Sequence, residues 1–157
     1  MVFTRSVSCF LLLIIILGCE ESSNSNPVLD INGSWVSLCG PLGSDDDSFV
    51  ADEYLIYVRT FNIGSLSILA TIYSDPDCVN ETGETSTLVG SYSIGESIIS
   101  SSGLDVYEIN LTTTIQNVES TRLDIVRRDD NKLYFGASMP ENSRPIDLDF
   151  ANIYTLQ

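Results

Sequence analysis

The side chains that could do chemistry in this chain are carboxylates and thiols, because its 157 residues include no histidine. Without an imidazole, Ser-His and Cys-His nucleophilic sites, histidine-ligated zinc and imidazole proton relays are all excluded. Paired carboxylates can hydrolyse glycosides when they lie about 5 to 9.5 Å apart. No acidic pair, however, is flanked by an aromatic platform for a sugar. We therefore expect a protein that is not an enzyme.

Two acidic segments carry the hard oxygen ligands that calcium requires. The first holds Asp45-Asp46-Asp47 with Asp52-Glu53, and the second holds Asp75 and Asp77. Neither has the full ligand spacing of a calcium loop, so solvated loop charge is the alternative interpretation. The stronger candidate is Asp75 with Asp77, because a disulfide at the adjacent Cys78 would hold this backbone in place. No other cofactor is expected.

The charge balance limits the partners. The chain has 22 Asp plus Glu against 7 Lys plus Arg, a formal net charge of -15. Such a surface repels phosphate backbones, so nucleic acid is excluded as a partner. Anionic partners in general are disfavoured except at a local basic spot. The adjacent Arg127-Arg128 could form such a spot or be a solvated strand end.

The N-terminal segment predicts export. Residues 1–18 carry Arg5 and then an apolar run that is about half of the ~20 residues needed to span a bilayer, which is typical of a signal peptide. The run Ile16-Leu17-Gly18-Cys19 resembles the bacterial lipobox. That resemblance implies cleavage before Cys19 and acylation of its thiol, and Glu20 after it implies delivery to the outer membrane. An ordinary signal peptide with an incidental cysteine is the alternative.

A polar segment follows the predicted lipid attachment site. Residues 19–30 include little that could be buried and are expected to form a flexible tether that holds the domain roughly 15 Å from the lipid. One domain would then occupy residues 31–157. Of the four cysteines, only Cys39 and Cys78 remain for a disulfide after signal removal and lipidation. Export favours that bridge, and two separately buried thiols are the alternative.

The domain shows the alternation of apolar and polar residues that is typical of strands with one buried face. Leu66 and Ile68 alternate with serines, Ile109 and Leu111 with Asn110 and Thr112, and Leu123 and Ile125 with Arg122 and Asp124. Turn residues separate such segments, as at 62–64, 102–103 and 129–131. The pattern predicts eight strands, at 33–39, 53–62, 65–74, 86–94, 104–115, 119–128, 131–136 and 152–156.

Eight short strands joined mostly by hairpins favour an antiparallel up-and-down barrel, because closure removes exposed edges. A two-sheet sandwich is the alternative. Gly33-Ser34-Trp35 resembles the Gly-x-Trp start of lipocalin-like barrels. The resemblance implies that Trp35 closes one end of the barrel and that an arginine near the C-terminus packs across it, the candidate being Arg144. A wider set of segments, from Trp35 to Phe150, is similar to small lipid-anchored bacterial β proteins of no assigned activity.

Two functions from different classes remain open. In one, the barrel is a binding module for a small apolar molecule. In the other, side chains fill the barrel and its surface binds another envelope protein or has a structural role. Free volume inside the barrel distinguishes them, and the small residues Ala70 and Gly90 are compatible with both. The candidate lining of a cavity is Leu66, Ile68, Ile109, Leu111, Leu123, Ile125 and Phe135.

Overall fold

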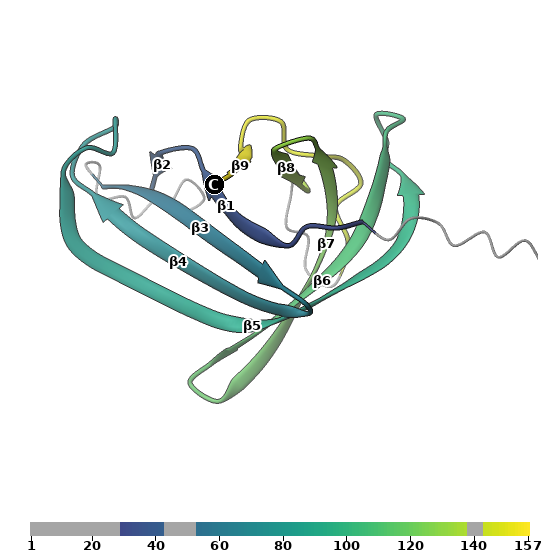
Figure 1. Ribbon diagram of the computed structural model, residues 1–157, viewed down its shortest axis with the longest axis horizontal. Helices are drawn as coiled ribbons and strands as arrows, with labels where there is room; N and C mark the ends of the chain where they lie inside the picture. Colours follow the sequence, from purple (N-terminus) through teal and green to yellow (C-terminus); the bar gives the residue numbers. More distant parts are fainter. Residues whose placement is uncertain (1–28, 43–52, 138–142) are drawn as a thin grey trace, which may run out of the picture.

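The protein is a closed antiparallel β-barrel. The computed structural model describes residues 29–42, 53–137 and 143–157, and these contain strands but no helix (Figure 1). The predicted signal peptide and nearly all of the predicted tether, including Cys19, lie outside the described residues. The strands are β1 (Gly33–Ser37), β2 (Gly40–Pro41), β3 (Tyr54–Asn62), β4 (Ser65–Tyr73), β5 (Glu81–Ile99), β6 (Asp105–Ile115), β7 (Val118–Asp129), β8 (Lys132–Phe135) and β9 (Tyr154–Leu156).

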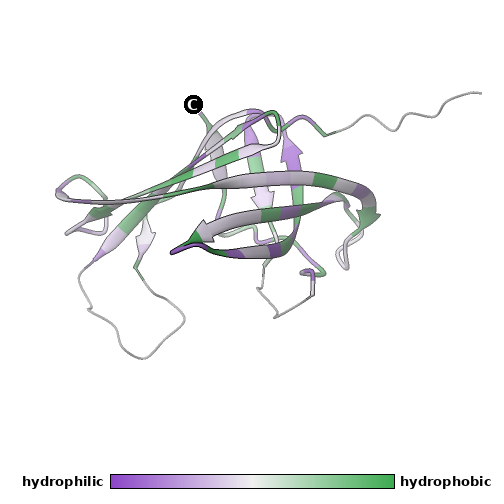
Figure 2. Ribbon diagram, turned by 90° about the horizontal axis from the view of Figure 1, so that it is seen from below, coloured by the Kyte–Doolittle hydropathy of each residue, from purple (hydrophilic) through white to green (hydrophobic). Residues whose placement is uncertain are grey.

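The topology is up-and-down. From β3 to β9, each strand pairs with the next one in the sequence, and β1 lies between β9 and β3, where it completes the ring. The two-residue β2 is an extra strand on β3. The prediction of an eight-stranded barrel is therefore confirmed, with this one addition, and the sandwich is wrong. Figure 2 shows the hydrophobic and hydrophilic residues along these strands.

The strand bounds follow the alternating pattern closely except in β5. The sequence predicts a strand at 86–94, whereas β5 runs from Glu81 to Ile99. Its first part, from Glu81 to Thr87, has no large apolar residue on either face, and Gly95-Glu96-Ser97 interrupts the alternation before Ile98 and Ile99, so alternation does not mark its ends. The pairing of β5 with β6 shifts register between Ile94 and Ser97. The predicted turn at 62–64 is confirmed by positive φ angles at Ile63 (42°) and Gly64 (81°).

One end of the barrel is closed around Trp35. Its side chain is fully buried, and its Nε1 donates a 2.8 Å hydrogen bond to the carbonyl oxygen of Ile31. The guanidinium of Arg128 lies 5.4 Å from the centre of the Trp35 ring and donates to the carbonyl oxygen of Asp30. The prediction that Arg144 packs across Trp35 is therefore wrong. Arg128 is the residue that does so, because β7 ends beside the start of β1.

A second hydrophobic cluster lies outside the barrel wall. Val106, Ile125 and Tyr134 pack there with Leu148, which belongs to the segment before β9. Ile125 is therefore not part of the interior, and neither is Leu123, which lies two residues away on the same face of β7. The prediction that these two residues line a cavity is wrong.

Polar contacts fasten this C-terminal segment to the barrel. Asp147 accepts hydrogen bonds from the hydroxyls of Ser101 and Ser102, at 2.9 and 2.7 Å. Arg144 donates to the carbonyl oxygens of Ile109 and Asp124, both at 2.8 Å, and its Nε lies 3.0 Å from a carboxylate oxygen of Glu108. Arg144 thus anchors a connecting segment to β6 and β7.

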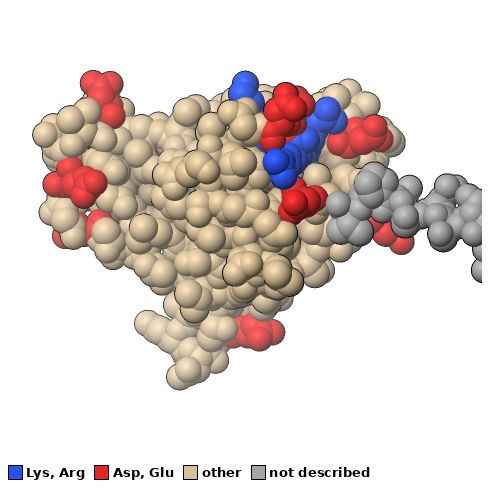
Figure 3. All heavy atoms as spheres, viewed as in Figure 1, with Lys and Arg blue, Asp and Glu red and all other residues tan. Residues whose placement is uncertain are grey.

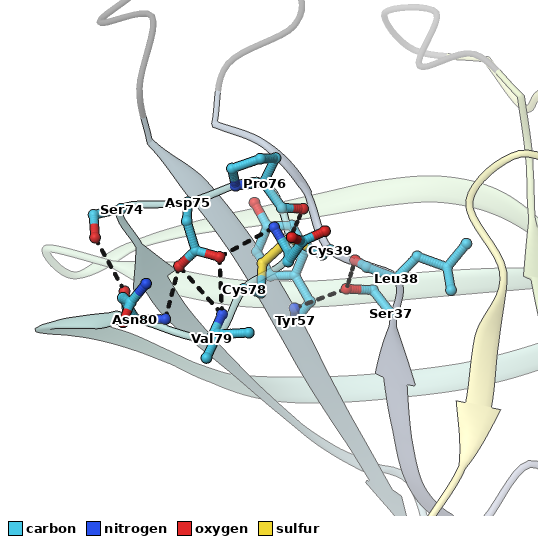
Figure 4. Close-up of a disulfide and its surroundings, with 11 residues drawn as sticks. Ser37, Leu38, Cys39, Tyr57, Ser74, Asp75, Pro76, Cys78, Val79 and Asn80 are labelled. Carbon is cyan, nitrogen blue, oxygen red and sulfur yellow. Dashed lines mark hydrogen bonds between the residues drawn. A yellow bond between two sulfur atoms is a disulfide. The ribbon is translucent and has the colours of Figure 1, made fainter.

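The predicted disulfide joins Cys39 to Cys78, which are 39 residues apart (Figure 4). It links the chain after β1 to the loop between β4 and β5. Within that loop, the carboxylate of Asp75 accepts hydrogen bonds from the backbone N–H groups of Asp77, Val79 and Asn80. Chiefly through the bond from Asn80, these bonds lower the pKa of Asp75.

Candidate functional site

The interior of the barrel is more exposed in one half than in the other. Around Trp35, the interior residues Ile31, Phe61 and Leu66 are at most 3% exposed. In the other half, several residues on the same interior face keep solvent-accessible surface, although Leu55 near the start of β3 is only 8% exposed. The partly exposed residues are Tyr57 on β3, Ile68 and Ala70 on β4, Leu88 on β5, and Thr113 and Arg122 on β6 and β7.

Of the predicted cavity-lining residues, the structure brings five together. Leu66, Ile109, Leu111 and Phe135 are buried members of the interior cluster, and Ile68 packs against it with part of its surface exposed. Gly90 lies directly opposite Leu66 on the neighbouring strand. A Cβ on Gly90 would lie only 1.9 Å from the carbonyl oxygen of Thr112. Gly90 therefore serves a close approach of the β5 and β6 backbones.

Arg59 is the unexpected residue of the interior. It lies opposite Trp35 on β3, and its guanidinium carbon is 4.5 Å from the ring centre of Phe135 and 4.7 Å from that of Tyr154. Both rings belong to the buried interior cluster. The Nε and Nη1 atoms of Arg59 are buried and have no hydrogen-bond partner among the described residues. The residue as a whole keeps some exposed surface.

A second pair of charges faces the same space from β7. Asp124 lies opposite the buried Ile109, is itself 0% exposed, and accepts a 2.6 Å hydrogen bond from Nη2 of Arg122. Its other oxygen accepts from the backbone N–H groups of Ile125 and Gly136. The Arg122 side chain is 30% exposed, and its Nε is buried without a partner.

Burial is the main cause of the pKa shifts of Arg59 and Asp124. Desolvation by burial lowers the pKa of Arg59, against an opposing contribution from Tyr154, and the nearby Arg122 lowers it further. Desolvation raises the pKa of Asp124, and the guanidinium of Arg122 only partly opposes this shift. The charged forms of both residues are therefore poorly solvated. Two guanidinium groups face one carboxylate, which leaves one positive charge in excess within a strongly acidic protein.

The alternating pattern of the sequence contains a signal for the interior position of Arg59. Arg59 has the same parity as Tyr57 and Phe61 in the predicted strand 53–62, so it shares their face. Asp124 could not be found in this way. Both faces of β7 are buried, one by the barrel interior and one by the C-terminal segment, so alternation does not show which face points inward.

Among the described residues, the structure adds no further metal ligands to Asp75 and Asp77. Within residues 29–42, 53–137 and 143–157, no group of three or more acidic or cysteine side chains could hold a metal ion. The carboxylate of Asp75 is engaged by backbone N–H groups, as described above. Calcium at Asp75 and Asp77 stays a prediction. The other acidic segment, with Asp45, Asp46, Asp47 and Asp52, lies outside the described residues.

In comparisons with known proteins, no family model, no curated protein and no solved structure matches this chain. No helix in the described part is long and apolar enough to cross a membrane. Figure 3 shows one face of the molecule, on which the few basic side chains gather in one place with acidic neighbours, and most of the rest is uncharged.

Proposed function

We propose that this protein is a lipid-anchored lipoprotein of the bacterial cell envelope, held at the outer membrane through Cys19, and that its barrel is a binding module for a small, largely apolar molecule. The observation that carries the binding role is the difference between the two halves of the interior. Ligand sites are concave and mostly apolar, with a small number of polar groups that fix orientation. The partly exposed half has this composition.

A neutral fluorescent probe tests the binding role. N-Phenylnaphthylamine gains fluorescence when it enters an apolar site, and we expect this gain with the mature domain. Ala70 lies beside Tyr57 on the neighbouring strand, on the interior face of the same wall, so the larger ring of Ala70→Phe should fill the site and abolish the gain. The matched control is Thr71→Phe, which adds the same ring to the outer face of the same strand. No gain with the unaltered domain would contradict the binding role.

The anchor is tested separately. The mass of the protein purified from its native membrane should exceed that of the chain starting at Cys19 by a diacylglyceryl group and an acyl chain. Such a modification exceeds the two signals needed for stable anchoring. The Cys19→Ala variant should lose this mass and leave the membrane fraction. An unmodified native mass would contradict the anchor and leave the binding role standing.

The protruding hairpin favours a second function, docking of an envelope protein. The tip of the β6–β7 hairpin projects beyond the barrel in Figure 1. It carries the cross-strand pair Ile115 and Val118, which are 52% and 68% exposed. Apolar residues at such a tip are available to a partner. Crosslinking from position 117 in intact cells, with the Ile115→Ser and Val118→Ser variants as controls, would detect that partner.

A further inference from the structure

We infer that the molecule bound in the barrel carries a carboxylate, and that Arg59 binds it. This inference rests on the proposed binding function and specifies the class of ligand. It predicts an amphiphile whose apolar part lies against the partly exposed interior residues, with its acid group at the guanidinium of Arg59.

The first support is the unsatisfied state of Arg59. Buried polar groups in folded proteins are almost always hydrogen-bonded, and one without a partner needs an explanation such as a ligand. Two nitrogens of Arg59 are buried without a partner among the described residues. A guanidinium presents N–H donors in a planar arrangement that matches the oxygens of a carboxylate.

The second support is the position of the charge. The rings of Phe135 and Tyr154 contact the guanidinium at 4.5 and 4.7 Å and hold it inside the barrel. Aromatic rings stabilise a cation without neutralising it, so the charge remains available to an anion. Tyr57 and Ile68, which neighbour Arg59 on the interior face, are partly exposed, so the guanidinium lies next to the partly exposed half of the interior.

The third support is the local charge balance. The only carboxylate described in contact with this group, Asp124, is already bound to Arg122 and to two backbone N–H groups. Arg59 and Arg122 together exceed Asp124 by one positive charge. One monoanionic ligand neutralises this excess, whereas a cationic ligand increases it.

Three ligands that share an alkyl chain and differ in the polar end provide the test. Calorimetric titration with decanoate, decanol and decyltrimethylammonium should show decanoate binding most tightly, by about 10- to 100-fold over decanol, as hydrogen bonds to a charged group are worth. The cationic amphiphile should bind most weakly. Equal affinity for decanoate and decanol, or no binding of decanoate, would overturn the inference.

Variants assign the preference to Arg59. The Arg59→Met variant should bind decanoate and decanol with similar affinity, and Arg59→Lys should retain part of the preference. Arg127→Met is the matched control, since it removes an arginine from the outer face of β7. If Arg59→Met keeps the full preference for decanoate, Arg59 is not the anchor and the inference fails.

The two proposals fail in different ways. Binding of N-phenylnaphthylamine without a preference for decanoate would leave a binding module for neutral apolar molecules and remove the carboxylate. If N-phenylnaphthylamine does not bind and decanoate is not preferred, both the proposed binding function and the inferred carboxylate ligand are wrong. If the Arg59→Met variant does not fold, the comparison of the three ligands on the unaltered protein and on Arg59→Lys still decides.

Discussion

Arg59 is placed at a cost in stability. A buried charge without a hydrogen-bonded partner costs several kcal/mol, whereas each contact of a guanidinium with an aromatic ring is worth about 1 to 2 kcal/mol. Phe135 and Tyr154 therefore offset only part of the cost. Residues that reduce stability at this depth are characteristic of binding sites.

Replacement of Arg59 by an uncharged residue of similar length should stabilise the empty barrel. We expect Arg59→Met to raise the free energy of unfolding by about 1 kcal/mol or more, because it removes the desolvated charge and keeps most of the apolar packing. Urea unfolding of the ligand-free domain measures this. A large loss of stability would show that Arg59 serves the fold, with Arg127→Met as the control for loss of an arginine elsewhere.

The attachment of the C-terminal segment to the barrel depends on pH through Asp147. Hydrogen bonds from Ser102, the backbone of Leu148 and Ser101 lower its pKa from the ordinary value of 3.8. Because the folded-state pKa lies below the unfolded one, the stabilisation is complete above pH 3.8 and is lost as the pH falls through the lower, folded-state pKa.

The corresponding measurement is the melting temperature between pH 6 and pH 2. It should fall in the acid range, because Asp147 and Asp75 must both take up protons there. The Asp147→Asn variant should start lower at pH 6 and fall less steeply, since its side chain does not titrate. Identical slopes for the variant and the unaltered protein would contradict the role of Asp147.

At the scale of the elements, β5 depends on a glycine for its pairing with β6. Gly90 permits a backbone approach that any larger residue would obstruct, since its Cβ would lie 1.9 Å from the carbonyl oxygen of Thr112. Glycine within a strand commonly marks such a close approach. The 19-residue β5 pairs with both β4 and β6 and thereby joins the two sides of the barrel.

The Gly90→Ala variant should therefore be destabilised by about 1 to 3 kcal/mol, the usual cost of overpacking, although alanine is otherwise a conservative change. Chemical denaturation of the two proteins measures the difference. Gly83→Ala would not be a fair control, because Gly83 has a positive φ angle of 86°. Gly40→Ala is suitable, since a Cβ there meets nothing within 4 Å.

Most of the fold was predictable from alternation because most strands have one face in the core and one in solvent. The prediction from alternation failed where a strand does not have one buried face and one exposed face. In β7 both faces are buried, so Leu123 and Ile125 were assigned to the wrong side. Arg128 rather than Arg144 covers Trp35 because this contact depends on which strand ends beside β1, a property of the closed barrel. The Arg59 site needed the structure, since only the three-dimensional arrangement shows that its nitrogens lack partners.

At the scale of the whole molecule, the disulfide constrains a long stretch of chain. It joins two cysteines that are 39 positions apart in the sequence and closes a loop that contains β2, β3 and β4. In the chain-entropy model, a bridge of this span stabilises the fold by about 4 kcal/mol, mainly by restricting the unfolded chain.

We expect the double variant Cys39→Ser with Cys78→Ser to lose about 2 to 4 kcal/mol of unfolding free energy. Urea unfolding of oxidised, reduced and double-variant proteins checks this. The reduced protein should match the double variant, since both lack the covalent link. A double variant as stable as the oxidised protein would mean that the bridge does not contribute to folding.

The chain enters the barrel at the end closed by Trp35. Leu29 packs against the interior cluster there, and Asp30 accepts the hydrogen bond from Arg128. If Cys19 is fixed in a lipid bilayer, the chain from the anchor joins the barrel at the end closed by Trp35, so the partly exposed half of the interior lies at the opposite end from the point of attachment. On the proposed function, an amphiphile would enter and leave through this opposite half, and the predicted flexible tether would let that half face either the aqueous side or the anchoring leaflet.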